Sequence, residues 1–516
     1  MIEKIKNIFL LKSAKFNYEV NEMDTFAMHE LRQKVDEKYV GFRPESGSVK
    51  PVHIATGAFR TILGQSFTAE GIKKLSYVVG AKGKTPKSNE LDKVMEYLSN
   101  NNAIDREEIQ DKQVENFRFM LQKLVDVDKG VYGIDDGMLA YTAGAMQFVT
   151  SKGIHEDAGE FIGGLIKEYC PKLGIYISGI LKNNDDAISL VFEPILNNGD
   201  VNAERSIFRH KNVAAFERPS KTLNTYLLSL KTSGECLKAQ LERHPNKLTQ
   251  LRLFILFCIY ELIRYLSLLE TFYEGGEIRP ILLDFTNNKK DDKDSSISET
   301  SRLCYSQLHK AISRFYTWGF AKVLNSYGWG KEEMLKIDVP LYEKNKKLNA
   351  KIKDELKSMW NIAKSNIETM SDKDARLEVG MAINDMIPII ATSHPVNYMR
   401  KLGIEIGLLY PPTNFHTDKR FILSEDILES LLRCCVMPDE TITSSELRDR
   451  LYDRLSIVIG GMEEDVIRLK KIGSIVYADT DALANNFELF SDTLQRMNFA
   501  EQLPDGIMQI RFGGNI

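Results

Sequence analysis

The chain has 516 residues, of which 43% are apolar and 27% are charged, and its formal net charge is −4. At roughly 150 residues per domain this length predicts about three domains, and the composition excludes a disordered scaffold, a collagen-like rod and a disulfide mini-protein. With 68 Lys and Arg against 72 Asp and Glu, no overall basic field draws the chain onto nucleic acid or membrane. Any such affinity has to come from local patches.

The first 150 residues predict an N-terminal α+β domain. Apolar residues recur at helical spacing over 26–40 and 114–125, and these two segments are expected to be helices. Between them, residues 43–51 are rich in Pro, Gly and Ser, which is typical of a loop.

Residues 151–330 predict a central helical domain, and residues 331–400 predict a helical connector. A Gly-rich apolar stretch over 133–181 indicates helices that pack closely, and 185–194 has the pattern of a strand. The longer helices are expected over 223–230, 248–272 and 299–324. Within the connector, 331–370 alternates Lys and Glu with apolar residues, which favours a solvated helix or a helical hairpin.

Residues 401–516 carry the clearest local signals, and they predict a winged-helix-like domain. Ser424 precedes two acidic residues, as an N-cap should, and Thr443 with Glu446 forms a capping box that opens a second helix. A third helix is expected over 479–497, followed by an alternating, strand-like segment over 506–512. Three helices followed by a β element is the order of a winged helix. The chain as a whole is therefore predicted to be mainly α (α+β), a multidomain helical body with this domain at its C-terminus.

The six cysteines predict structural thiols in a reducing, cytoplasmic compartment, because none of them forms a C-x-x-C pair or completes a zinc-binding spacing with histidine. No membrane span is expected either. The longest apolar run, 251–269, contains Arg252, Glu261 and Arg264, which favours a helix buried within the protein. The N-terminus lacks the apolar core and small-residue cleavage site of a signal peptide.

No motif predicts a catalytic residue, a metal ligand or a cofactor. Residues 80–85 (Gly-Ala-Lys-Gly-Lys-Thr) come nearest to a phosphate-binding loop, but Val78 stands where that loop needs its first glycine. None of the eight histidines lies in a metal-binding motif. A nuclease-type arrangement of Glu277 and Asp284 with the lysines at 289 and 290 lacks the usual spacing, so a strand ending in a polar turn is the simpler interpretation.

Charge is distributed unevenly along the chain. Residues 43–87 contain eight Lys and Arg against two acids, and residues 205–252 contain ten against three, interleaved with Phe208 and Phe216. So many Lys and Arg residues in a short stretch could neutralise several phosphates of a nucleic acid. The same cations could instead face solvent or acids from elsewhere in the fold. The candidate nucleic-acid-binding residues are Arg205, Arg209, His210, Lys211, Arg218 and Lys221.

The predicted winged-helix-like domain has the opposite charge. Residues 424–516 contain 17 acids and nine Lys and Arg, and the expected third helix over 479–497 has Arg496 as its single basic residue. A helix that reads the major groove should be basic, so this domain is expected to dock a protein rather than DNA.

The C-terminal third resembles accessory proteins of multigene bacterial antiphage and restriction systems, such as those of phosphorothioation-dependent restriction and methylation-associated defence. The resemblance covers roughly 110 residues, is a hydrophobic framework with turn glycines, and carries over no active-site residue. It rests on 402–404, 407–411, 419–421, 427–431, 447–455, 457–460, Asn485, Asn486, Leu494 and 503–506.

The resemblance implies a role inside a prokaryotic DNA-targeting defence complex. We therefore predict a non-catalytic subunit that contacts DNA through the basic stretch and binds an ATPase, helicase or nuclease subunit through the acidic domain. Two alternatives stay open. One is a metal-dependent nuclease subunit whose acids meet only in the folded chain, and the other is a protein-interaction scaffold in which the basic stretches face acidic neighbours.

Overall fold

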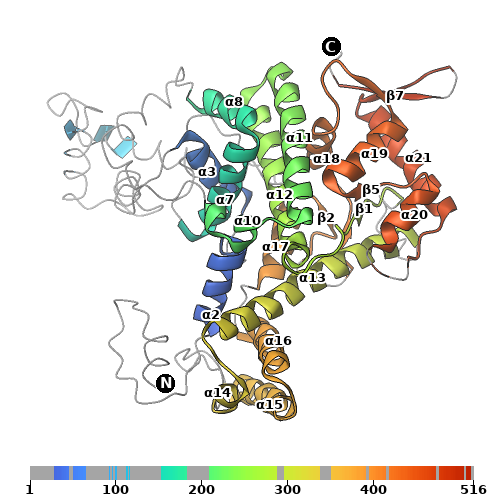
Figure 1. Ribbon diagram of the computed structural model, residues 1–516. Helices are drawn as coiled ribbons and strands as arrows, with labels where there is room; N and C mark the ends of the chain where they lie inside the picture. The colour runs from blue at the N-terminus through green and yellow to red at the C-terminus, as the bar shows by residue number, and fades with distance from the viewer. Residues whose placement is uncertain are drawn as a thin grey trace.

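The computed structural model describes most of the chain beyond residue 208 and shorter segments before it. The described residues are 28–45, 50–64, 153–182, 209–286, 296–337, 350–390, 394–413, 418–471, 473, 476–504 and 507–512, with isolated positions between 92 and 116. The structure is mainly helical, as predicted (Figure 1). The expected strand over 185–194 and the glycine-rich turn at 80–85 lie outside the described residues.

Helix α12 (Lys247–Glu274) is the centre of the body. It is apolar on every side and buried along most of its length, which a helix in the middle of a core requires. Asn246 caps its N-terminus by accepting hydrogen bonds from the amides of Leu248 and Thr249. Helix α11 (Lys221–Arg243) precedes it and packs beside it, and the two are longer than the predicted helical pair. Neither α12 nor any other described helix combines the length and apolarity needed to cross a bilayer.

The helices from the first half of the chain pack on one side of this pair. Helices α3 (Pro51–Leu63) and α7 (Gly153–Tyr169) cross so closely that a Cβ atom on Gly159 would lie 2.2 Å from the carbonyl oxygen of Ile54. The glycines therefore permit the close helix packing that the sequence indicates. The remaining elements from this part of the chain are the π-helix η1 (Asp36–Val40), α8 (Pro171–Leu181), the 3₁₀ helix η3 (Arg209–Asn212), α10 (Ala214–Glu217) and α2 (Met28–Val35), which packs on the later helix at Ser296–Ser326.

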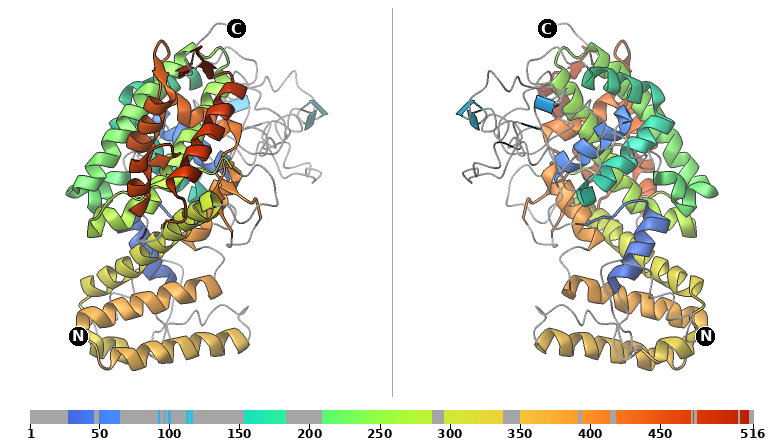
Figure 2. Two further views of the ribbon diagram at one scale, coloured as in Figure 1. Left: turned by 90° about the vertical axis from the view of Figure 1, so that its right-hand side faces the viewer. Right: turned by 90° about the vertical axis from the view of Figure 1, so that its left-hand side faces the viewer.

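Helix α13 (Ser296–Ser326) runs from the body to a helical group that projects below it (Figure 2). This group contains α14 (Lys331–Leu335), α15 (Ala350–Ile367) and α16 (Asp372–Ile390). Helix α16 packs on both α13 and α15, and buried Trp360 donates its indole hydrogen bond to the carbonyl of Ile337 at 2.9 Å. Within the predicted range 331–370 the described residues form α14 and α15, and the helix that packs against α15, α16, begins only after that range.

The C-terminal module, residues 424–512, lies on the other side of α11 and α12 (Figure 1). Its three strands form an antiparallel sheet in the order β4-β7-β6, so the first strand pairs with the last. The Thr443–Glu446 capping box is present as predicted. The elements are α18 (Glu425–Arg433), β4 (Thr441–Thr443), α19 (Ser444–Leu455), β5 (Ile457–Val458), α20 (Glu463–Lys470), α21 (Thr480–Arg496), β6 (Ala500–Gln502) and β7 (Met508–Arg511).

Short strands join this module to the body. Strand β1 (Ile281–Leu282) of the body pairs in parallel with β5 of the module. Before the module, helix α17 (Pro395–Glu405) is followed by strands β2 (Leu409–Tyr410) and β3 (Arg420–Phe421), which pair with each other as a hairpin. The side chain of Gln240 donates to the carbonyl of Val436 at 2.7 Å, so polar contacts also cross between the predicted central and C-terminal domains. One continuous apolar core includes residues from all of these parts.

Candidate nucleic-acid and docking surfaces

The structure separates the predicted nucleic-acid-binding residues into different environments. Arg205 lies outside the described residues. Arg209 is the first residue of η3, and the structure describes its backbone alone. Lys211, Arg218 and Lys221 are exposed around the start of α11, where Ser220 caps the helix. The ammonium of Lys211 lies 3.4 Å from the carboxylate of Glu168 and stays 56% exposed.

His210 does not belong to this surface. Its side chain is 1% exposed, and its Nε2 atom lies 2.7 Å from Oε2 of Glu168. The rings of Phe161, Tyr169 and Phe216 pack around it, and burial lowers the pKa of His210 although Glu168 opposes the shift. This imidazole is therefore a core group, and no phosphate can reach it in this structure. Sequence reasoning placed it among the cations because its neighbours in the chain are basic.

Two further cations of the basic stretch are paired with acids of the C-terminal module. Arg243 near the end of α11 forms an ion pair with Asp439, and Arg252 on α12 forms one with Asp426. A groove of about 450 Å³ lies beside the first pair, between α11 and the segment that joins α18 to β4. The basic and acidic stretches that the sequence shows separately thus partly neutralise each other between body and module. This matches the alternative in which the acids come from elsewhere in the fold.

Helix α21 presents an acidic face away from the body. Asp481, Glu488 and Asp492 are exposed and recur at spacings of seven and four residues, which places them on one side of the helix. On the opposite side Leu483, Asn486, Phe490, Ser491 and Leu494 are buried. No basic residue of α21 other than Arg496 lies on the exposed side. The surface is therefore unsuited to phosphates and suited to a cationic protein surface.

Asn486 holds this helix against the body. Its Nδ2 donates to the carbonyls of Leu283 at 2.8 Å and Ile459 at 2.6 Å, and its Oδ1 accepts from the amide of Phe285 at 2.8 Å. Three backbone groups from two segments are thereby satisfied by one side chain that is fully buried. The orientation of the acidic face is fixed by this contact.

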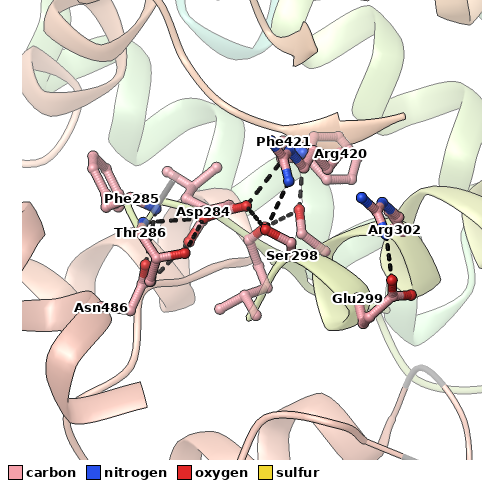
Figure 3. A network of polar contacts seen from close by, with 12 residues as sticks. Asp284, Phe285, Thr286, Ser298, Glu299, Arg302, Arg420, Phe421 and Asn486 are labelled. Atoms are coloured by element: carbon pink, nitrogen blue, oxygen red, sulfur yellow. Dashed lines mark hydrogen bonds and ion pairs between the residues drawn. The ribbon is translucent and has the colours of Figure 1, made fainter. Parts of the chain in front are cut away.

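Asp284 lies beside Asn486 in a buried polar network (Figure 3). One carboxylate oxygen accepts from the hydroxyl of Ser298 at 2.6 Å, and the other accepts from the amide and hydroxyl of Thr286 at 3.0 and 2.8 Å. The guanidinium of Arg420 donates to the Ser298 hydroxyl at 2.7 Å and lies 3.6 Å from Asp284. The network joins β1, α13 and β3, and it gives the carboxylate a structural role.

The residues considered for a nuclease-type site are not brought together. Asp284 is 2% exposed within the network, whereas Glu277 is largely exposed and pairs with Lys471 at 3.2 Å. The lysines at 289 and 290 lie outside the described residues. Within the described part of the chain, no three His, Cys, Asp or Glu side chains are grouped as metal ligands would be.

Comparison with known proteins places the chain in no family. No protein-family model, curated protein or solved structure matches it. Its function therefore has to be inferred from the residues themselves.

The sequence pointed to some of these residues and missed others. Asn485 and Asn486 were part of the C-terminal framework, but nothing in their pattern distinguished the exposed amide from the buried one that bonds three backbone groups. The network around Asp284 was missed because its members come from three segments, one of them more than a hundred residues from the other two. The sequence held one signal for this network, namely that Asp284 is a polar residue directly after a short apolar strand.

Proposed function

We propose that the chain is a non-catalytic subunit that binds a protein partner through the acidic face of α21. The observation that carries the proposal is the orientation of this helix, with Asn486 fixed against the body and Asp481, Glu488 and Asp492 exposed on the other side. Surfaces of complementary potential attract and orient protein partners, so a basic surface on the partner is expected.

We propose further that the C-terminal module is a winged-helix-like domain. The support is topological: β4 lies between α18 and α19, α21 precedes the β6–β7 hairpin, and the first strand of the sheet pairs with the last, whereas β5 and α20 are additional elements between α19 and α21. In this interpretation α21 occupies the place of the helix that enters the major groove in DNA-binding relatives of the fold. Its acidic face favours a protein partner there.

The resemblance described above suggests the setting. In a prokaryotic antiphage complex, the partner would be an ATPase or helicase, or a nuclease subunit, produced with this chain. The scaffold alternative shares this docking surface and differs in having no contact with DNA. The nuclease alternative loses support from Asp284, because that carboxylate is occupied by Ser298 and Thr286.

The test is charge reversal of the α21 face in the full-length chain. The triple variant Asp481→Lys, Glu488→Lys, Asp492→Lys should fail to co-purify with a co-expressed ATPase or helicase of such a system, whereas the unchanged chain should co-purify with it. A matched control reverses three exposed acids elsewhere, Glu235, Asp354 and Glu355. Equal co-purification of both variants would contradict the proposal, and unchanged circular dichroism would show that both remain folded.

A second candidate function, DNA contact, is favoured by the exposed cations Lys211, Arg218 and Lys221. Reversing all three to Glu should weaken binding to duplex DNA. If each contacts one phosphate, the slope of log affinity against log salt should fall by about 3, at roughly 0.9 per phosphate. The control reverses Lys351, Lys353 and Lys357, which lie on α15, away from these cations. An unchanged slope in the first variant would remove DNA contact from the proposal and favour the scaffold.

A further inference from the structure

A small cavity lies where the body meets the C-terminal module. Its volume is about 20 Å³, and it borders the parallel pair of β1 and β5 (Figure 1). A cavity needs roughly 10 to 15 Å³ to hold one water molecule, so this space accepts a water or a monoatomic ion and is too small for a phosphate. The polar lining residues are Arg264 and Ser267 of α12, Arg279 before β1 and Ser456 before β5, and the other lining residues are apolar or aromatic.

Arg264 brings a buried donor without a partner to this cavity. Its side chain is 5% exposed, and its Nε–H has no hydrogen-bond acceptor within the described residues. The rest of the guanidinium is occupied, because Nη1 lies 3.3 and 3.4 Å from the two carboxylate oxygens of Glu261 and the central carbon lies 5.3 Å from the centre of the Tyr226 ring. Buried donors are normally satisfied, so a group in the cavity would supply the missing acceptor.

The charge around the cavity is positive. Arg279 lines it together with Arg264, and its side chain is 21% exposed, so this end borders solvent. Arg279 lies 2.8 Å from Glu270, but Glu270 is shared with Arg314. Burial raises the pKa of Glu261 although Arg264 opposes the shift, which favours the neutral form of the carboxyl beside Arg264. Two acids thus serve three arginines, and no acid is among the described residues that line the cavity itself.

We propose that the cavity is a binding site for a single halide ion, chloride being the common one, with Arg264 as the donor and Arg279 at the entrance. A monoatomic anion fits the volume, accepts the hydrogen bond of the Arg264 Nε–H and offsets the excess positive charge. A buried water molecule usually makes about three hydrogen bonds, which this mostly apolar lining supplies poorly, and it would leave the charge unchanged. The anion is therefore the better match.

The ion would strengthen the junction between the body and the module. Ile281 of β1 and Ser456 of the module both line the cavity, and the amide of Ile281 donates to the carbonyl of Ser456 at 2.9 Å. An anion held between Arg264 and this pair of segments would stabilise the folded chain. The docking surface on α21 is not part of this site, so either proposal can fail without the other.

The experiment compares thermal unfolding of the full chain in sodium chloride, sodium bromide and sodium gluconate at one ionic strength. Chloride and bromide should raise the unfolding temperature saturably relative to gluconate, because an ion that binds only the folded state stabilises it by mass action. Chloride NMR of the folded chain should show line broadening that bromide removes by competition.

Three variants locate the ion. Arg264→Gln, which can still donate to Glu261, should remove both the thermal response and the broadening. Arg279→Gln should raise the half-saturating chloride concentration several-fold. Arg496→Gln removes an arginine of α21, which does not line the cavity, and should leave both responses unchanged. General effects of salt act on all of these variants alike, so the difference between them isolates the site.

Each outcome decides the proposal. Loss of the halide response in Arg264→Gln and its weakening in Arg279→Gln support the site. If the wild-type chain shows no saturable response, the cavity holds water only and the proposal is overturned. Responses that persist unchanged in both variants place the ion elsewhere and also overturn it. If Arg264→Gln does not fold, Arg279→Gln decides alone, because Arg279 is partly exposed and its replacement disturbs the core less.

Discussion

The contact of Asn486 with three backbone groups makes a quantitative prediction. Replacing Asn486 by Ala leaves the carbonyls of Leu283 and Ile459 and the amide of Phe285 without their partners. An unsatisfied buried polar group costs about 1 to 3 kcal/mol. Water entering the vacated space would satisfy some of these groups, so we take the lower value for each and expect a loss of about 3 kcal/mol.

The neighbouring Asn485 supplies the control, because it is exposed on the same helix. Asn485→Ala should leave stability unchanged or raise it by about 0.5 kcal/mol through helix propensity. Urea unfolding followed by circular dichroism measures both variants, and hydrogen exchange of a peptide containing Phe285 measures the local effect. Since about 1.4 kcal/mol corresponds to a factor of ten, exchange there should accelerate by about 100-fold in Asn486→Ala. If the two alanine variants behave alike, the reasoning about this contact is wrong.

Three other predictions concern charge, pH and thiol chemistry. Arg252→Asp and Asp426→Arg should each lower the unfolding free energy by up to about 1 kcal/mol, and the double exchange should restore most of it; strictly additive losses in a double-mutant cycle would argue against the pair. Burial raises the pKa of Asp36 from 3.8 to about 7 despite Arg32 and Tyr316, so its contribution to stability is present at low pH and is lost as the pH rises through that range. Asp36→Asn should therefore flatten the plot of unfolding free energy against pH between pH 4 and 7. An unchanged slope of this plot would show that Asp36 is not the group responsible. All six cysteines are buried and free, and burial raises the pKa of Cys236 to about 11, so a thiol reagent at pH 8 should label the chain only in denaturant; labelling of the native protein would contradict the structure.

Local signals predicted three of the C-terminal helices closely, and α20 (Glu463–Lys470) was not predicted. The N-cap at Asp479 and the capping box at Thr443 each involve residues three positions apart, so the sequence contains the whole interaction. Helix α18 also begins after Ser424, where the acidic first turn indicates, although the Ser424 side chain forms no capping hydrogen bond. The central helices were predicted as well, but the predicted first helix ended at 230 whereas α11 continues to Arg243. Its second half was missed because polar residues there face solvent and weaken the apolar pattern.

Interactions between distant segments could not be predicted. The parallel pairing of Ile281 with Ile457 joins residues far apart in the chain, and two-residue strands give little periodicity to detect. The two charge-rich stretches were visible, but their pairing through Arg243 and Asp439 depends on which faces meet in the fold.

The burial of α12 on all sides has a consequence during synthesis. The helix ends at Glu274, but Ser430 of α18, whose hydroxyl donates to the carbonyl of Leu253 at 2.8 Å, is translated more than 150 residues later. Leu455, whose carbonyl accepts from Tyr260 at 2.6 Å, follows later still. At about 5 to 20 residues per second, the ribosome exposes one flank of this apolar helix for roughly 8 to 30 seconds. A nascent chain of this length is a strong substrate for chaperones, and shortening the chain before α18 should send it to aggregates or proteolysis.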